Sequence, residues 1–230
     1  MYLVEKIYTI IYNFIGENML IYIVRHGETN MNQARILQGS YDEPLNEAGI
    51  SLAKISGKAL KGIHFDEAFS SPLSRSFDTI RILLDESENL VTPIHIDKRL
   101  QEVNTGDWTL KHLDDTSDPE YEHIHQFFKD PFSYLDVPNG ENVYDVMKRT
   151  QEFIKELAAR NDDKTYLIGT HGFATRCLLN MFYENKKDFW HGHVPYNCCF
   201  NILEVKNNDI SLIKEDVCFY DKDSIKDYYS

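Results

Sequence analysis

A chain of 230 residues can form one large domain or two small ones, and it is long enough to bury a substantial core. Hydrophobic residues make up 42% and charged residues 27%, as in ordinary globular proteins. Asp and Glu number 37 against 24 Lys and Arg, a formal net charge of -13. This charge argues against general nucleic-acid binding, which needs a basic face, but it allows a small basic pocket for one phosphate.

Residues 1–18 carry apolar side chains at helical spacing. Glu5, Asn13 and the lack of a small-residue cleavage site argue against a signal peptide. Two interpretations stay open: an accessory amphipathic helix, or a translation start at Met19, which we favour. No stretch approaches the roughly 20 apolar residues of a membrane helix, so no membrane association is expected.

The four cysteines do not form a C-x-x-C pair, so neither a zinc site nor a redox motif is indicated. We expect free thiols in a reducing cytosol, and hence a cytoplasmic protein. Two H-x-H pairs, at 123–125 and 191–193, have no third ligand at a telling spacing, so no metal is expected. The cysteines are Cys177, Cys198, Cys199 and Cys218.

From residue 19 onward, short apolar runs alternate with helical patterns, which is typical of an α/β protein. No internal repeat or flexible linker is visible. The predicted strands are 20–24, 66–69, 94–96, 165–169, 198–204 and 210–213.

Helices are predicted by their caps and by apolar spacing. Asn46 is expected to cap a helix that runs to about Leu60. Ser71 is the predicted N-cap of the next helix, with Pro72 at its first position. Two further amphipathic helices are expected at 141–159 and 173–183.

Residues 108–140 differ from the rest, with prolines, many acids and scattered aromatic residues. At most a short helix is expected near 120–128. A long irregular insertion in a compact domain often covers a functional site, so this segment is interpreted as a cap.

Three segments share one layout, in which a strand is followed by a tight turn and a helix or loop. Arg25-His26-Gly27 follows "LIYIV", Ser70-Ser71-Pro72 with Arg75 follows "EAF", and Thr170-His171-Gly172 follows "TYLIG". Ligands bind beyond the carboxyl ends of the strands in open α/β sheets. If these strands are parallel neighbours, two arginines and two histidines face one crevice.

Paired arginines suit a phosphoryl group, because each guanidinium is a permanently charged fork of donors. The free N–H groups at helix starts add to this attraction. A glycine after each histidine, Gly27 and Gly172, is expected to let phosphate approach the backbone. Taken alone, each of these residues is more often a surface charge or a turn. Their repetition on three segments, followed by "RLQEVNTGDW", favours a site.

An ordered set of motifs resembles the histidine phosphatase superfamily, the phosphoglycerate mutase-like proteins. The motifs are "RHGET" with Asn32 and "LQG" (37–39), "PLNEAG", "SPLSRSFDT", "RLQEVNTGDW", "GENVYDVMKR" and "GTHG", in order between about 20 and 205. The resemblance implies a three-layer α/β/α sandwich with a mostly parallel central sheet. It places a single domain at 19–220, with the cap insertion at about 108–140 and a tail at 221–230.

The resemblance also implies a role for each matching residue. His26 would be the nucleophile that becomes a phosphohistidine, and Glu102 the proton donor. No metal or organic cofactor is implied. Arg25, Arg75 and His171 would bind the phosphoryl oxygens, and the substrate pocket would also include Thr29, Asn32, Gln38, Gly39 and Gly172.

These residue types fit that chemistry. An imidazole is a good nucleophile only when neutral, and nearby Arg25 and Arg75 disfavour its protonation. Glu102, if protonated, can donate to the leaving oxygen and can then accept a proton from the attacking water.

A phosphatase is the first functional prediction, because mutases of this family usually have "TGW" where this chain has "LQG". A phosphoglycerate mutase is the alternative, and a catalytically silent module that binds phosphorylated ligands is the third. The acidic cap should repel substrates with several phosphates, so small monophosphate esters are expected to be preferred over sugar bisphosphates. The oligomeric state is not indicated. The cap aromatics that could meet an apolar leaving group are Tyr121, Phe127, Phe128, Phe132 and Tyr134.

Overall fold

The computed structural model describes residues 18–221, and in this part of the chain six strands form one mixed sheet. The strand order is β3-β2-β4-β1-β5-β6. The first four strands in this order are parallel, and β5 and β6 add two antiparallel pairings. The strands are β1 (Met19–Arg25), β2 (Glu67–Ser70), β3 (Ile94–Ile96), β4 (Thr165–Thr170), β5 (Phe200–Lys206) and β6 (Asp209–Val217).

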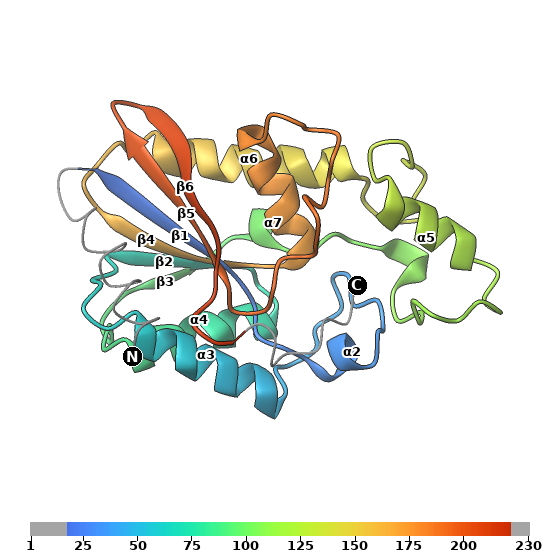
Figure 1. Cartoon of the computed structure of the whole chain (residues 1–230), viewed down its shortest axis with the longest axis horizontal. Coiled ribbons are helices and arrows are strands. Elements are labelled where there is room, and N and C mark those ends of the chain that lie inside the picture. Colours follow the sequence, from blue (N-terminus) through green and yellow to red (C-terminus); the bar gives the residue numbers. More distant parts are fainter. Residues whose placement is uncertain (1–17, 222–230) are drawn as a thin grey trace.

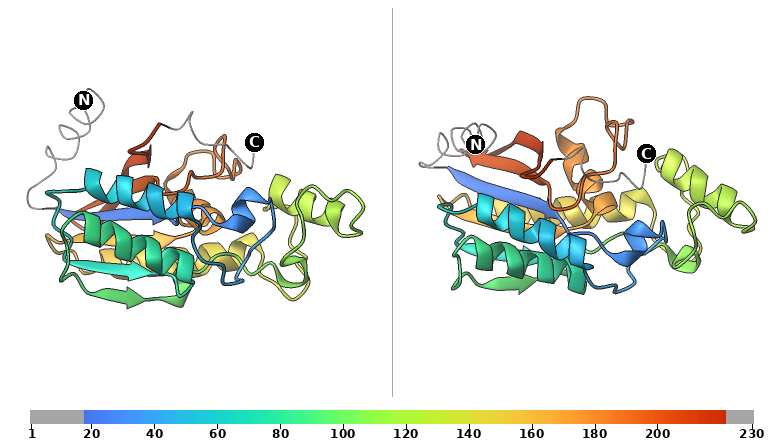
Figure 2. Two further views of the ribbon diagram at one scale, coloured as in Figure 1. Left: turned by 90° about the horizontal axis from the view of Figure 1, so that it is seen from below. Right: turned by 60° about the horizontal axis from the view of Figure 1, so that its bottom comes forward.

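Helices cover both faces of the sheet, with α3 and α4 on one side and α6 and α7 on the other (Figures 1 and 2). The predicted three-layer sandwich with a mostly parallel sheet is therefore confirmed. The predictions for residues 1–17 and 222–230 lie outside the described residues. The helices are α2 (Asn30–Gln33), α3 (Glu47–Ala59), α4 (Ser74–Glu86), α5 (Tyr121–Lys129), α6 (Val143–Ala158) and α7 (Gly172–Leu179).

The predicted helix starts are right in one case and wrong in another. Asn46 caps α3 as expected, and its side chain accepts a hydrogen bond from the backbone N–H of Gly49 at 2.8 Å. The prediction for Ser71 is wrong, because α4 begins at Ser74 after an extended Leu73. The Ser71 hydroxyl instead lies 2.7 Å from Nε2 of His171. This side chain therefore belongs to the site and not to a helix cap.

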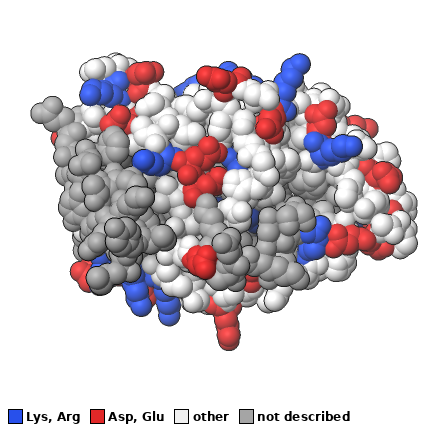
Figure 3. Space-filling view, in the orientation of Figure 1, with Lys and Arg blue, Asp and Glu red and all other residues white. Residues whose placement is uncertain are grey.

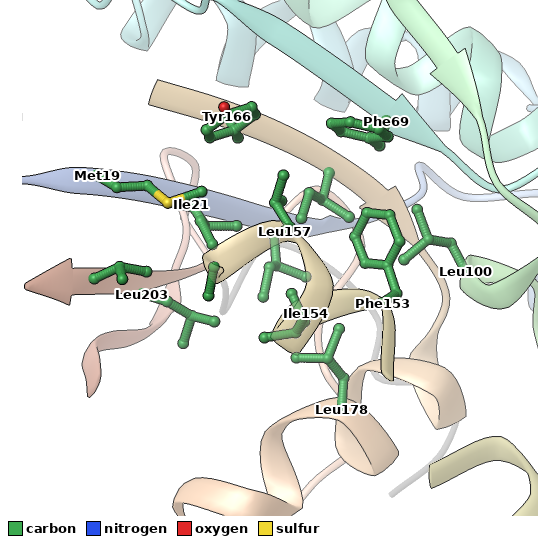
Figure 4. Close-up of a cluster of buried hydrophobic side chains, with 14 of the residues drawn as sticks. Met19, Ile21, Phe69, Leu100, Phe153, Ile154, Leu157, Tyr166, Leu178 and Leu203 are labelled. Atoms are coloured by element: carbon green, nitrogen blue, oxygen red, sulfur yellow. The ribbon is translucent and has the colours of Figure 1, made fainter. Parts of the chain in front are cut away.

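Strand β1 is buried on both faces, which explains its unbroken apolar run. Ile21 and Ile23 pack toward α6 and α7, in the cluster drawn in Figure 4. Tyr22 and Val24 pack toward α3 and α4 on the opposite face. The core thus fixes β1 from both sides, so the polar residues at and after its end are held in place.

The predicted cap segment has a small core of its own at one end of the molecule, where α5 projects (Figure 1). Trp108 is fully buried, packs against Phe127 and Tyr134, and donates a hydrogen bond from Nε1 to Glu120 at 2.9 Å. Phe127 also stacks on Phe173 of α7, with ring centroids 5.3 Å apart. The segment is therefore packed against the carboxyl side of the sheet.

The expectation of four free thiols is wrong for two of them. Cys199 and Cys218 form a disulfide, with Cα atoms 4.5 Å apart. They directly precede β5 and follow β6, and the register pairs Phe200 with Val217, so the antiparallel ladder brings the two cysteines opposite each other. Cys177 and Cys198 are free and buried.

On the face seen in Figure 3, acidic and basic side chains are interspersed. No helix between residues 18 and 221 is long and apolar enough to cross a membrane. The absence of nucleic-acid binding stays a prediction.

Candidate active site

Three parallel strands deliver the predicted residues to one edge of the sheet. The register pairs Arg25 of β1 with Thr170 of β4, and Ser70 of β2 with Gly169 of β4, so the three strands end side by side. His26 and His171 follow directly, and their ring centroids lie 5.0 Å apart.

His26 is held in one orientation by its own backbone and by an arginine. Its Nδ1 lies 2.7 Å from the carbonyl oxygen of Gly27, and Nε of Arg75 lies 3.3 Å from its Nε2. A guanidinium can only donate, so we assign Nε2 as the acceptor and Nδ1 as the protonated nitrogen. In this tautomer the lone pair of Nε2 is directed to the arginine side, where an anion would bind.

The pKa values of both histidines are lowered, which favours the neutral imidazole. Burial lowers the pKa of His26 well below its usual value of 6.5, and the charges of Arg75 and Arg25 lower it further. Burial also lowers the pKa of His171, again with Arg75 as the next cause. An uncharged imidazole beside two guanidinium groups is the form that can act as a nucleophile.

Arg75 is almost fully buried, and the turn after α2 fixes its guanidinium. Its two terminal nitrogens donate to the carbonyl oxygens of Tyr41 and Gly39, at 2.7 and 2.9 Å. Gly39 has a φ of 48°, and a Cβ there would lie 2.3 Å from Oγ1 of Thr105. Only glycine fits this turn, which explains the "LQG" motif as the support of Arg75.

Of the two glycines that follow the histidines, Gly27 is required by packing. A Cβ on Gly27 would lie 2.6 Å from the carbonyl oxygen of Gly49, so this glycine admits the backbone of α3 and not a phosphate. A Cβ on Gly172 would lie 3.3 Å from a Val194 methyl group and 3.5 Å from Nε of Arg25, which is an ordinary contact distance. The expected reason for this glycine, the approach of a phosphate, stays a prediction. Nη1 of Arg25 donates to the carbonyl oxygen of Pro195 at 2.5 Å.

Glu102 sits at the N-terminus of α7. Its carboxylate accepts hydrogen bonds from the backbone N–H groups of Phe173 and Ala174, at 3.2 and 3.0 Å. Arg149 of α6 holds the loop beneath it, because its guanidinium donates to the carbonyl oxygen of Glu102 at 3.1 Å and pairs with Glu141 at 2.8 Å. The "GENVYDVMKR" motif contains both members of this pair, but sequence reasoning assigned them no role.

A single cavity of about 370 Å³ contains most of the predicted site. His171 and Thr29 are not on its wall: His171 is fully buried against Ser71, and the Thr29 hydroxyl accepts from the backbone N–H of Asn32 as the cap of α2. Thr29 therefore lies outside the cavity wall, unlike the other residues predicted for the substrate pocket, and Ser71, predicted as a helix cap, contacts His171 instead. The predicted residues that line the cavity are Arg25, His26, Asn32, Gln38, Gly39, Arg75, Glu102 and Gly172.

Within residues 18–221 no group of three His, Cys, Asp or Glu side chains is arranged to hold a metal ion. The cavity wall itself presents the imidazole of His26, the guanidinium groups of Arg25 and Arg75, and the carboxyl group of Glu102. Such a set of groups at the carboxyl edge of an α/β sheet suits one phosphoryl-sized anion.

The model of the histidine phosphatase superfamily (branch 1) matches residues 21–215. The chain belongs to this superfamily, as its motifs predicted. The adenosylcobalamin/alpha-ribazole phosphatase of Salmonella typhimurium is 30% identical over 181 residues, which cover 78% of this chain and 88% of the relative. A probable phosphoglycerate mutase GpmB of Yersinia pestis is 30% identical over 161 residues, 70% of this chain and 73% of that protein.

Solved structures give the same answer for the fold. Bacillus stearothermophilus YhfR aligns with a TM-score of 0.80 at 29% identity, covering 86% of this chain and 97% of that one. A phosphoglycerate mutase from Bacillus anthracis aligns with a TM-score of 0.77 at 23% identity, covering 88% and 95%. The predicted enzyme class, a phosphoric monoester hydrolase of this superfamily, is confirmed at the level of the family.

Proposed function

We propose that the protein hydrolyses small phosphate monoesters through a covalent phosphohistidine on His26, with Glu102 as general acid and base. The observation that carries this proposal is the oriented ring of His26, whose Nε2 faces Arg75 in the same cavity as Glu102. Arg25 and Arg75 offset the charge of a phosphate monoester, which is close to a dianion at neutral pH.

In the first step, Nε2 of His26 attacks phosphorus and the ester P–O bond breaks. The leaving oxygen takes the proton of the Glu102 carboxyl group, so the alcohol departs neutral. In the second step, water attacks phosphorus, its proton passes to the Glu102 carboxylate, and the P–N bond breaks. Inorganic phosphate and the starting form of His26 result. His171 contacts the ring of His26 and the hydroxyl of Ser71, and it supports the phosphate cradle, which is formed by Arg25, His26 and Arg75.

A labelling experiment tests this proposal. Brief incubation with a radiolabelled monoester and an acid-free quench should trap one labelled phosphate on the wild type, stable to base and labile to acid. The His26→Ala variant should lose both the label and the release of inorganic phosphate. The matched control is His64→Ala, since that side chain is 75% exposed and pairs with Asp66 at the surface. Full phosphate release by His26→Ala would end the proposal.

A phosphoglycerate mutase is the second candidate, favoured by the 30% identity to a probable member of that class. The same phosphohistidine would then pass its phosphate to a second hydroxyl in place of water. Incubation with 3-phosphoglycerate separates the two. A phosphatase releases inorganic phosphate, whereas a mutase forms 2-phosphoglycerate without net release.

A further inference from the structure

We propose that the cavity selects monoesters whose alcohol carries an aromatic or similarly flat apolar ring. This inference rests on the proposed function, because hydrolysis of the selected esters requires it. The preference for a ring is itself a property of binding. It follows from the part of the cavity that lies beyond the phosphate cradle.

That part of the cavity is walled mainly by apolar side chains, and its polar members are Arg35, His125 and Lys129. The apolar side chains come from the turn after α2, the loop at Val103, the cap around α5, and the segment from α7 to residue 194. A volume of about 370 Å³ lies within the range of roughly 300–1,000 Å³ typical of pockets for organic ligands. The apolar lining residues are Ile36, Leu37, Val103, Leu113, Ile124, Phe128, Phe173, Trp190 and Val194.

Three of these residues form an aromatic corner. Phe128 of α5 and Trp190 lie with ring centroids 6.4 Å apart and planes inclined by 27°. Phe173 of α7 meets each of them edge to face, at 6.2 and 5.9 Å. A flat ring entering this corner can pair with more than one of them, and each aromatic pair is worth roughly a two- to tenfold gain in affinity beyond burial.

Two of the polar groups near the corner are already engaged. The indole Nε1 of Trp190 donates to the carbonyl oxygen of Phe128 at 2.7 Å, so the indole presents ring carbons to the cavity. Nε of Arg35, on the cavity wall, is 2.7 Å from a carboxylate oxygen of Asp114. A polyol would give up its hydration here and find few partners, which costs free energy. The corner therefore discriminates against hydrophilic alcohols.

The structure places only one of the predicted cap aromatics at the cavity. Of the five cap aromatics expected to meet a leaving group, Phe128 lines the cavity. The other four face the interior or surface of the cap, and Phe132, for example, packs against Phe189 and Tyr144. Phe128 and Phe132 are thus a matched pair of half-buried rings, one on the cavity and one away from it.

The test compares 2-phenylethyl phosphate with glycerol 3-phosphate. Both are esters of primary alkyl alcohols, so a difference in kcat/KM reports the cavity and not the leaving group. We expect at least tenfold higher kcat/KM for the phenylethyl ester. Phe128→Ala should lower this preference three- to tenfold, Phe128→Leu should lower it less, and Phe132→Ala should leave it unchanged. Equal kcat/KM for the two esters, or equal effects of Phe128→Ala and Phe132→Ala, would overturn the inference while the phosphatase stands.

A binding measurement separates this inference from the proposed function. Calorimetry with 2-phenylethylphosphonate and ethylphosphonate needs no turnover, since neither is hydrolysed. If no phosphate is released from any ester but the phenylethyl compound binds at least tenfold tighter, the selection holds and the hydrolytic function fails. Equal affinities for the two phosphonates contradict the selection, whatever the turnover.

Discussion

The rings of His26 and His171 lie with centroids 5.0 Å apart and planes inclined by 60°, although they follow different strands. Strand β4 lies between β1 and β2, so the residue after β4 lies between the two segments that supply His26 and Arg75. His171 contacts Ser71 on its other side, at 2.7 Å. His171 therefore supports the ring of His26 from the buried side, and the charge state of His26 decides what the phosphate cradle can bind.

We expect the His26 imidazole to stay neutral throughout the pH range 6.5–8, since burial and the two arginines lower its pKa. A nucleophile with a lowered pKa loses activity only as the pH falls through that lowered value. Replacing Arg75 by Gln removes one repelling charge, so the pKa of His26 should rise and the loss should begin at higher pH. Imidazole NMR titration of wild type and Arg75→Gln measures the direction directly.

The control for this titration is Arg81→Gln, on the same helix but with its side chain 59% exposed. It should leave the His26 titration unchanged, because an exposed charge is screened by solvent. A wild-type His26 that titrates near 6.5, or an Arg75→Gln variant with a lower pKa than wild type, contradicts this account.

Gly27→Ala should destabilise the fold by about 1–3 kcal/mol, the usual cost of overpacking. The new methyl group would lie 2.6 Å from the Gly49 carbonyl oxygen, and both backbones are held by buried elements. Gly172→Ala is the matched comparison and should destabilise the fold less, since the nearest atom to its new methyl group is a Val194 methyl group at 3.3 Å. Urea unfolding of both variants measures the difference. A Gly27→Ala protein as stable as wild type would mean that α3 can move away.

The strand ends were predictable because they are local. An apolar run followed by Arg-His-Gly or Thr-His-Gly predicts both a strand and a polar segment at its end. Parallel packing then brings such strand ends together. The sequence could not show what each glycine faces. Gly27 contacts a helix that begins some twenty residues later, so its reason became visible only with the packing of α3 against β1.

Contacts that depend on register or on distant loops also escaped prediction. Cys199 and Cys218 pair because β5 and β6 are in one particular register, which the apolar patterns of the two strands do not specify. Phe173 is the first residue of the helix predicted at 173–183, and Trp190 lies beyond its end. Their meeting with Phe128 depends on how the cap folds over the sheet.

The disulfide between Cys199 and Cys218 predicts a thiol count. Unfolding without reductant should expose two titratable thiols, those of Cys177 and Cys198, and reduction should raise the count to four. Cys218→Ser should lower the free energy of unfolding of the oxidised protein by about 3 kcal/mol, given the short loop that is closed. In the control Cys177→Ser, one thiol should titrate before reduction and the disulfide should persist. Four thiols in the unreduced protein would contradict the pairing.

Arg149 should act on catalysis only through the position of Glu102. Its guanidinium donates to the carbonyl oxygens of Gln101 and Glu102, at 2.6 and 3.1 Å, and a lysine at this site cannot reproduce that fork. We expect Arg149→Lys to lower kcat/KM for ethyl phosphate roughly 10- to 100-fold, the effect of a small misplacement of a reacting group. With 4-nitrophenyl phosphate the loss should be much smaller, because nitrophenolate departs without help from an acid. Arg160→Lys, which alters a half-exposed pair with Glu67, should change neither rate. An equal loss on both esters would show that Arg149 supports the fold in general and not the proton donor.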